Sequence, residues 1–378
     1  MKQYQHLVIW ASFWKFAPFS FKGSNARLFI TKHMEKVISP AVWQQLPVIV
    51  KAYQLPDNKK ATLQTITSFV PFVAIWAVMY LTMGISTWLT IGLAVLNAFF
   101  LVRIFIIQHD CGHQAFTASR KANDVLGQVC SYFTFIPYRY WAKSHNFHHG
   151  HNGLLWEHRD IGDVEVLTVQ EYGALNAWGK FKYRLYRSIP VMFFLGPIWY
   201  ILIHSRLPLI NMKGWEHARK ALLRHNIILA AVYTGLVLWL GYEAFVYVHL
   251  PILIAFGVIA IWFFYIQHQH ETTYKQWRDR WEYVKAAVQG STYYNLPKFI
   301  HWLTGNIGYH HIHHLNSLVP CYQLPRCLKE NPILDEVANK ITFTESLKCV
   351  FNHLWDEDSE RMISFREFNR RMRLRATS

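Results

Sequence analysis

Two long stretches of the chain contain no lysine or arginine, and they restrict the fold more than any other feature. They cover residues 65–102 and 226–271 and are strongly apolar. Each is long enough for two passes across a bilayer, since one transmembrane helix needs about 20 apolar residues. A short turn divides each stretch, at residues 84–87 and near residues 241–249. Because a backbone in lipid must satisfy its own hydrogen bonds, we expect an all-α integral membrane protein with four transmembrane helices in two hairpins.

The charge of the chain is distributed around these stretches. The 378 residues carry a formal charge of +16, and every lysine and arginine lies outside the two apolar stretches. The turns within the hairpins contain neither residue type, so the positive-inside rule places both termini and the rest of the chain on the cytoplasmic side. A basic face beside a membrane suits anionic lipid or an acidic partner protein, and it argues against a nucleic-acid partner.

The apolar stretches divide the chain into five consecutive parts. We expect an N-terminal cytoplasmic or interfacial segment at 1–65, a first hairpin at 66–108, a cytoplasmic region at 109–225, a second hairpin at 226–267 and a cytoplasmic C-terminal region at 268–378. The apolar run at 190–203 is too short to span, so we expect it to be interfacial or re-entrant. The arginine-rich tail beyond residue 360 predicts an amphipathic helix that faces either an anionic surface or solvent.

Four tight clusters hold eleven of the 21 histidines, and two of them directly follow the second and fourth expected spans. The clusters read HDCGH, HNFHH, HQH and HHIHH. Histidines four residues apart, or at positions i, i+3 and i+4, share one face of a helix. Three such sets give eight imidazoles, and the end of the fourth span supplies a ninth: His109, His113, His145, His148, His149, His310, His313, His314 and His268. His270 competes with His268 for the last place.

These histidines predict a metal site on the cytoplasmic side. Imidazole is the commonest metal ligand among side chains, and nine imidazoles are too many for one ion, so we expect two. Iron, zinc, copper and nickel all accept imidazole, whereas the shortage of carboxylates argues against calcium and magnesium. We expect Asp110 and Asp163 to accept hydrogen bonds from ligand N–H groups, and Asn306 to orient a water at the metals.

Two other classes of protein use similar residues. HDCGH has the form of a zinc-protease helix with Asp110 where glutamate is usual, but a membrane zinc protease would leave the other clusters unexplained. A metal transporter or metal store would hold ligands inside the spans along a pathway, whereas these histidines gather at the ends of the spans.

At the histidine clusters the sequence resembles the membrane fatty-acid desaturases, and it is most similar to the acyl-lipid Δ12 (omega-6) type. The three histidine boxes of that family have the forms HxxxH, HxxHH and HxxHH. They match His109/His113, His145/His148/His149 and His310/His313/His314. The stretches GDVEVLTVQEY at 162–172, FYIQHQHE at 264–271 and GNIGYHHIHHLNSLVP at 305–320 are similar to further family signatures, so the resemblance covers residues 66–330.

The resemblance implies a di-iron enzyme that uses O2 to introduce a cis double bond into a fatty acyl chain, with an acyl-lipid as the favoured substrate. Zinc is a possible non-native occupant of such a site. The sequence contains no His-Pro-Gly-Gly motif of a cytochrome b5-like domain, so the resemblance also implies a separate electron donor such as ferredoxin or cytochrome b5.

The nearest alternatives are a related di-iron hydroxylase or acetylenase and a desaturase of another regiospecificity, because these share the boxes. Two features depart from the family pattern. GHNG at 150–153 follows the second box where relatives often read ATSGN, and His270 stands where many relatives carry phenylalanine. Both features bear on where the double bond is placed.

Overall fold

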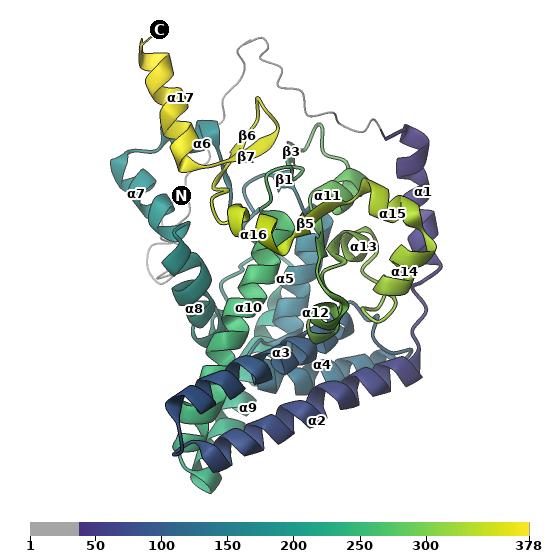
Figure 1. Ribbon diagram of the computed structural model, residues 1–378, viewed down its shortest axis with the longest axis vertical. Coiled ribbons are helices and arrows are strands. Elements are labelled where there is room, and N and C mark those ends of the chain that lie inside the picture. Colours follow the sequence, from purple (N-terminus) through teal and green to yellow (C-terminus); the bar gives the residue numbers. More distant parts are fainter. Residues whose placement is uncertain (1–37, 378) are drawn as a thin grey trace.

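The computed structural model describes residues 38–377, which are mostly helical (Figure 1). Residues 1–37, most of the expected N-terminal segment, lie outside the described part. Among the described residues, four helices are long and apolar enough to cross a membrane. They are α2 (Asn58–Thr82), α3 (Thr87–Gly112), α9 (Glu216–Leu240) and the continuous helix made of η3 (Ala244–His249) and α10 (Leu250–His268).

Two of these helices begin earlier than the apolar runs alone suggest. α2 starts at Asn58, where the Asp57 side chain caps the helix by accepting hydrogen bonds from the backbone N–H groups of Lys59 and Lys60. α9 starts at Glu216, ahead of the uncharged run that opens at residue 226. Hydropathy detects only the apolar part of a helix, whereas capping side chains and good helix formers set where the helix begins.

α3 is the central helix of the bundle. It packs against α2, α4 (Arg120–Thr134) and α10. Its one basic residue, Arg103, is 3% exposed. The guanidinium donates to Ser68 Oγ at 3.1 Å and to the Trp302 carbonyl, and it lies 4.1 Å from the centre of the Trp302 ring. A buried cation therefore has polar partners, as a charge within a helix bundle requires.

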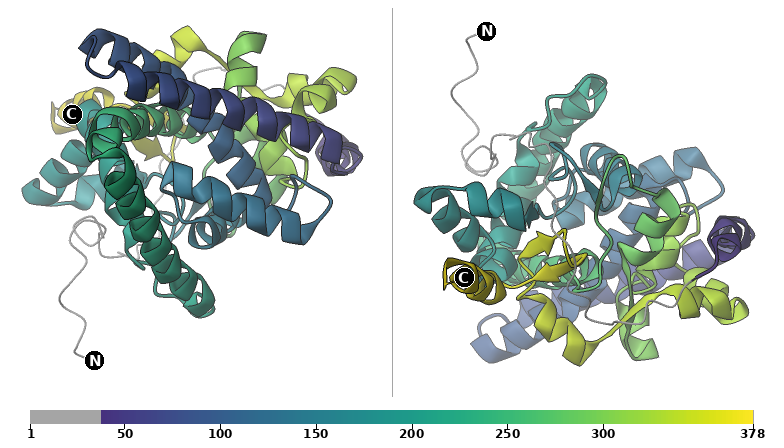
Figure 2. Two further views of the ribbon diagram at one scale, coloured as in Figure 1. Left: turned by 90° about the horizontal axis from the view of Figure 1, so that it is seen from below. Right: turned by 90° about the horizontal axis from the view of Figure 1, so that it is seen from above.

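The remaining helices form a cap that carries most of the polar residues. Seen from below, α2 and α3 lie side by side while α9 runs in a different direction (Figure 2). The cap and interface helices are α1 (Pro40–Lys51), α5 (Tyr138–His151), α6 (Val169–Ala174), α7 (Ala177–Tyr186), α8 (Gly196–Leu202), α11 (Tyr283–Gln289), α12 (Lys298–Leu303), α13 (His310–Leu315), α14 (Leu324–Glu330), α15 (Pro332–Val337), α16 (Phe343–Cys349) and α17 (Phe365–Thr377).

The apolar run at 190–203 forms a π-helical turn, η1 (Val191–Leu195), followed by α8 and by a short 3-10 turn, η2 (His204–Arg206). This unit is bent by 55° relative to α7, which is the geometry of a broken span or a re-entrant loop. It packs against α10 through a close approach at Gly257, where an added Cβ would lie 3.0 Å from Pro197 Cβ.

The expectation of an all-α chain was incomplete, because the cap also contains three small sheets (Figure 1). The strands are β1 (Leu154–Leu155), β2 (Leu167–Thr168), β3 (Gln276–Trp277), β4 (Thr292–Asn295), β5 (Asn339–Thr342), β6 (Leu354–Asp356) and β7 (Arg361–Ile363). β1 pairs with β3, β2 with β6 and β4 with β5, all in parallel, and β6 pairs with β7 antiparallel. Strands this short show no recognisable alternation in sequence, yet they tie distant parts of the cap together.

Candidate metal centre

The histidine clusters lie on helix ends and short helices that converge in the cap. His109 is in the last turn of α3, and His113 is the residue that follows its end. The second cluster lies on α5 and the fourth on α13, both of them helical as the spacing predicts. His268 is the last residue of α10. The structure therefore brings together residues up to 205 positions apart in the sequence.

Five imidazoles form a first group, in which the ring nitrogens that could bind a metal all lie within 4.8 Å of one another. Its members come from α3, α5 and α13: His109, His113, His145, His149 and His313. The Nε2 atom of His149 lies 3.1 Å from that of His145 and 3.0 Å from that of His313. All five side chains are buried.

A second group lies beside the first and draws on α5, α10 and α13. His148, His268 and His314 again place their ring nitrogens within 4.8 Å of one another. The Nε2 atom of His268 lies 3.2 Å from that of His148 and 3.0 Å from that of His310, which makes His310 a fourth member. The two groups together account for all nine predicted imidazoles.

The orientation of these rings fits a bound cation. His268 donates from Nδ1 to the Gly290 carbonyl at 3.0 Å, so its Nε2 atom carries a lone pair rather than a proton. That lone pair points at the Nε2 atoms of His148 and His310. Ligands about 2.1 Å from a metal and at right angles are about 3.0 Å apart, which agrees with the observed separations. A metal ion between the rings would accept the lone pair of His268 directly.

Comparison with known proteins gives the family. The family model described as fatty acid desaturase matches residues 86–338. A fatty acid desaturase of Bacillus subtilis is 40% identical over 324 residues, covering 85% of this chain and 91% of that protein. The chain belongs to the fatty acid desaturase family. It is therefore an oxidoreductase, and the family acts on fatty acyl substrates.

More distant relatives carry more specific names. The sn-1 oleoyl-lipid 12-desaturase of Anabaena variabilis is 22% identical, covering 71% of this chain and 75% of that protein. The sn-1 acyl-lipid omega-3 desaturase (ferredoxin) of Synechocystis is 27% identical, covering 62% of this chain and 65% of that protein.

Polar groups outside the two histidine groups hold the rings of this desaturase in place. Asp110 accepts a hydrogen bond from His109 Nδ1 at 2.8 Å and another from the Cys321 backbone N–H at 2.7 Å. Asp163 approaches His148 Nδ1 at 3.8 Å. Both carboxylates thus lie on the side of the ring away from Nε2, and the hydrogen bond from His109 to Asp110 fixes the orientation of that ring. A zinc protease would instead need a free carboxylate facing the metal.

Asn306 lies in the loop before α13, where its side chain has a backbone partner. Its side-chain amide donates to the Cys321 carbonyl at 3.1 Å, and its backbone has a left-handed conformation with φ of 62°. Asparagine tolerates that conformation better than most residues. The contact fastens the loop before α13 to the loop after it, and the expected role of Asn306 in orienting a water stays a prediction.

Burial keeps the imidazoles neutral. Loss of solvation, followed by repulsion from neighbouring imidazoles, lowers the pKa of six rings well below 6.5: His113, His145, His149, His310, His313 and His314. A neutral ring offers a lone pair without first losing a proton, so these side chains are ready to bind a metal at physiological pH.

Several neighbouring histidines stay outside both groups. His270 is buried, and its Nδ1 atom lies 3.4 Å from Thr272 Oγ1. His151 donates from Nδ1 to the Phe147 carbonyl at 2.8 Å and stacks on Trp156. His311 is buried beside Tyr293. The structure thus places His268, and not His270, among the nine.

Two parts of this environment were not predicted from the sequence. Trp141, one turn before His145 on α5, stacks on the His145 ring with centroids 4.6 Å apart. The Gly290 carbonyl that orients His268 follows α11. The i, i+4 spacing of Trp141 and His145 was a usable signal for the first contact, whereas a backbone carbonyl leaves no trace in the residue type.

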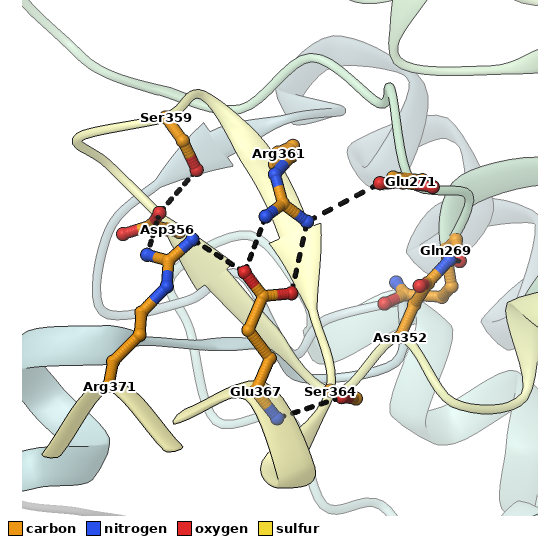
Figure 3. A network of polar contacts seen from close by, with 9 residues as sticks. All are labelled: Gln269, Glu271, Asn352, Asp356, Ser359, Arg361, Ser364, Glu367 and Arg371. Carbon is orange, nitrogen blue, oxygen red and sulfur yellow. Dashed lines mark hydrogen bonds and ion pairs between the residues drawn. The ribbon is translucent and has the colours of Figure 1, made fainter. Parts of the chain in front are cut away.

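The C-terminal segment is fastened to the residues that follow His268 (Figure 3). Arg361, on β7, donates to Glu271 at 3.3 Å and to Glu367 at 2.5 Å. Arg371, on α17, donates to Glu367 and to the buried Asp356, both at 2.6 Å. The expected basic helix does form, but Arg361 lies on a strand and Arg371 takes part in an internal network. The outward charge of α17 comes from other arginines, such as Arg366, Arg370 and Arg373.

Proposed function

We propose that the protein binds two iron ions, one in each histidine group. The first ion would be held by His109, His113, His145, His149 and His313, and the second by His148, His268, His310 and His314. The observation that carries the proposal is the convergence of buried imidazole Nε2 atoms at separations of 3.0–3.2 Å. Zinc can occupy the same imidazole cage as a non-native ion.

The bound iron would supply O2-dependent oxidation of an acyl chain, in which two hydrogens leave adjacent methylene carbons and, with two electrons and two protons from outside, O2 becomes two waters. The side chains do the positioning. Asp110 fixes the ring of His109 and Gly290 fixes that of His268 by hydrogen bonds, while the Asp163 carboxylate lies near the His148 ring. Trp141 holds the His145 ring by stacking.

We further propose that the product is a cis double bond at the Δ12 (omega-6) position of an acyl-lipid. The Anabaena relative named as an oleoyl-lipid 12-desaturase supports this position. The Bacillus relative, at higher identity, has a name without a position, which keeps desaturation at another carbon as the second candidate. A di-iron hydroxylase or acetylenase would use the same histidines and differ in the product.

The membrane topology belongs to the same proposal. α2 with α3, and α9 with η3 and α10, would form two transmembrane hairpins, with both termini and the metal site on the cytoplasmic side. The connections at residues 83–86 and 241–243 contain no lysine or arginine, which supports this orientation. Electrons would come from a separate carrier such as ferredoxin or cytochrome b5. The ferredoxin named for the Synechocystis relative supports that donor.

The test is a fatty-acid profile of a host that makes 16:0, 18:0, 16:1 and 18:1 but no dienes, and that supplies ferredoxin. Gas chromatography–mass spectrometry with derivatised double bonds should show new 18:2 with its second bond at carbon 12. A new double bond at another carbon would support desaturation but correct the proposed Δ12 position. A hydroxylated product would instead favour a di-iron hydroxylase.

Two histidine variants connect the product to the site. His145→Ala and His313→Ala should each abolish the new product and lower the iron content of the purified protein, while His204→Ala, outside both groups, should retain both. The amount of protein in the membrane fraction should stay the same in all three. Full activity of either cluster variant would refute the assignment of these histidines as ligands.

A further inference from the structure

A basic groove lies between α5 and α9, apart from both histidine groups. It has a volume of about 570 Å³. Its charged lining comes from two helix faces. Arg139 and Lys143 are four residues apart on α5, while His217, Lys220 and Arg224 occupy one face of the first turns of α9. Four permanent cations therefore face one open space.

Carboxylates neutralise little of this charge. Arg139 pairs with Asp124 at 3.2 Å. The Lys143 ammonium donates to the Gly214 carbonyl and lies 5.3 Å from the centre of the Trp215 ring. Within residues 38–377, no salt bridge joins Lys143, Lys220 or Arg224 to an acidic side chain. Lys143 also lies within electrostatic range of Glu216, so the charges of Lys220 and Arg224 are the two that the groove offers to an anion without a neighbouring carboxylate.

The two helices are held at a fixed separation beneath these cations. Tyr140, which lies between the two basic residues of α5, packs against Trp215, Ala218 and Leu222 in a small buried cluster. Its hydroxyl also accepts a hydrogen bond from the Ile210 backbone N–H at 2.8 Å. The positions of the cations are therefore set before any ligand arrives, which lowers the entropy lost on binding.

The surface next to the groove is apolar. On α9, Leu223 is 52% exposed and Ile227 is 72% exposed, directly beside and beyond the cationic turns. A ligand whose phosphate contacts Lys220 and Arg224 would place whatever is attached to it against these side chains. A soluble acidic protein would gain nothing from that apolar surface, whereas a lipid would place its acyl chains there.

We propose that the groove between α5 and α9 binds the phosphate of a membrane phospholipid, with the acyl chains lying along α9. Basic pockets beside transmembrane helices on the cytoplasmic side are suited to phospholipid head groups. The proposal rests on the proposed membrane span of α9, and it is independent of the reaction at the histidines. It would hold a lipid beside α5, the helix that carries His145, His148 and His149.

The test is a lipid titration of the purified full-length protein in an uncharged detergent, followed by native mass spectrometry. Phosphatidylglycerol is compared with a neutral monogalactosyl diacylglycerol that has the same acyl chains. Wild-type protein should prefer phosphatidylglycerol, and the double variant Lys220→Gln/Arg224→Gln should lose about ten-fold or more of its affinity for that lipid, as expected for two cations near a membrane surface. Its affinity for the neutral lipid should not change.

The matched control is Lys51→Gln/Lys59→Gln, which removes two exposed charges at the end of α1 and the start of α2. It should retain the preference, as should the charge-conserving variant Lys220→Arg/Arg224→Lys. Equal losses in the glutamine variants of the groove and of the control would overturn the proposal, because they would reflect overall charge alone.

Two competitors identify the ligand class. Inorganic phosphate at millimolar concentration should leave phosphatidylglycerol bound, and its displacement of the lipid would instead assign the groove to free phosphate. An acidic ferredoxin should bind the groove variant as well as it binds the wild type. If the groove variant loses ferredoxin binding but retains lipid binding, the groove is a binding surface for the electron donor, and the proposed lipid site is refuted. The fatty-acid profile tests the desaturase reaction separately.

Discussion

Replacing the buried Arg187 should loosen the cap beside the two histidine groups. Arg187 follows α7 and is 1% exposed. Its guanidinium donates to the carbonyls of Glu165 and Asn352 at 3.0 and 2.7 Å, and to the side-chain oxygens of Tyr265 and Gln269 at 2.9 and 3.2 Å. One cation thus joins three segments, including the residue after His268.

The magnitude follows from these bonds. In Arg187→Gln the shorter side chain can keep one of the four hydrogen bonds of the guanidinium. Each lost hydrogen bond from a charged donor is worth about 1.5–3 kcal/mol. Removing the buried charge recovers several kcal/mol of desolvation, which offsets much of that loss. We therefore expect a net destabilisation of about 2–4 kcal/mol, or a fall of roughly 4–8 °C in the apparent melting temperature.

The assay is thermal unfolding of the detergent-solubilised protein, followed by tryptophan fluorescence, with the iron content measured in the same samples. Arg370→Gln is the matched control, since Arg370 is an exposed arginine of α17. It should shift the midpoint by at most about 2 °C. If the two variants melt together, or if Arg187→Gln melts like the wild type, the reasoning from the buried guanidinium is refuted.

Two further changes test packing and charge. Gly127→Ala would place a Cβ 2.3 Å from the Tyr138 ring, so we expect a loss of about 1–3 kcal/mol in thermal unfolding, whereas Gly235→Ala, with nothing within 4 Å, should lose none. Burial raises the pKa of Glu367, but hydrogen bonds from two arginines outweigh it and hold the pKa below 4.5. The network should therefore stabilise α17 above about pH 4.5 and lose that effect as the pH falls further. Hydrogen exchange of α17, expressed as protection relative to the intrinsic rate at each pH, should show this loss, and in Glu367→Gln the protection should not fall over the same pH range.

The parts of the fold that follow from helical periodicity could be predicted from the sequence. The uncharged runs indicated the four long apolar helices, and the i, i+3, i+4 spacing placed His145, His148 and His149 on one side of α5. The spacing could not predict how the nine rings divide between the two histidine groups. His148 and His149 are neighbours, but consecutive side chains on a helix differ by about 100°, so the two rings belong to different groups.

Contacts between distant segments were beyond prediction from this one sequence. The Asn306 side-chain amide donates to the Cys321 carbonyl, a contact that becomes visible only once the loops around α13 are placed. The basic groove exists because α5 packs against α9. The sequence alone therefore could not predict that Lys143 and Lys220 face the same space. The ion pairs of Arg361 and Arg371 likewise depend on the short strands β6 and β7, which have no detectable period.

The division of the ligands among helices also sets the order in which the protein can be made. The first group takes residues from α3, α5 and α13, and the second from α5, α10 and α13. Both therefore need α13, the last of these helices to leave the ribosome. The first group is complete only after residue 313 has been synthesised, and the second only after residue 314. By then the segments of both proposed hairpins have already emerged. Membrane insertion can therefore begin on an apoprotein, and loading of a complete site belongs to a later, separate step of biogenesis.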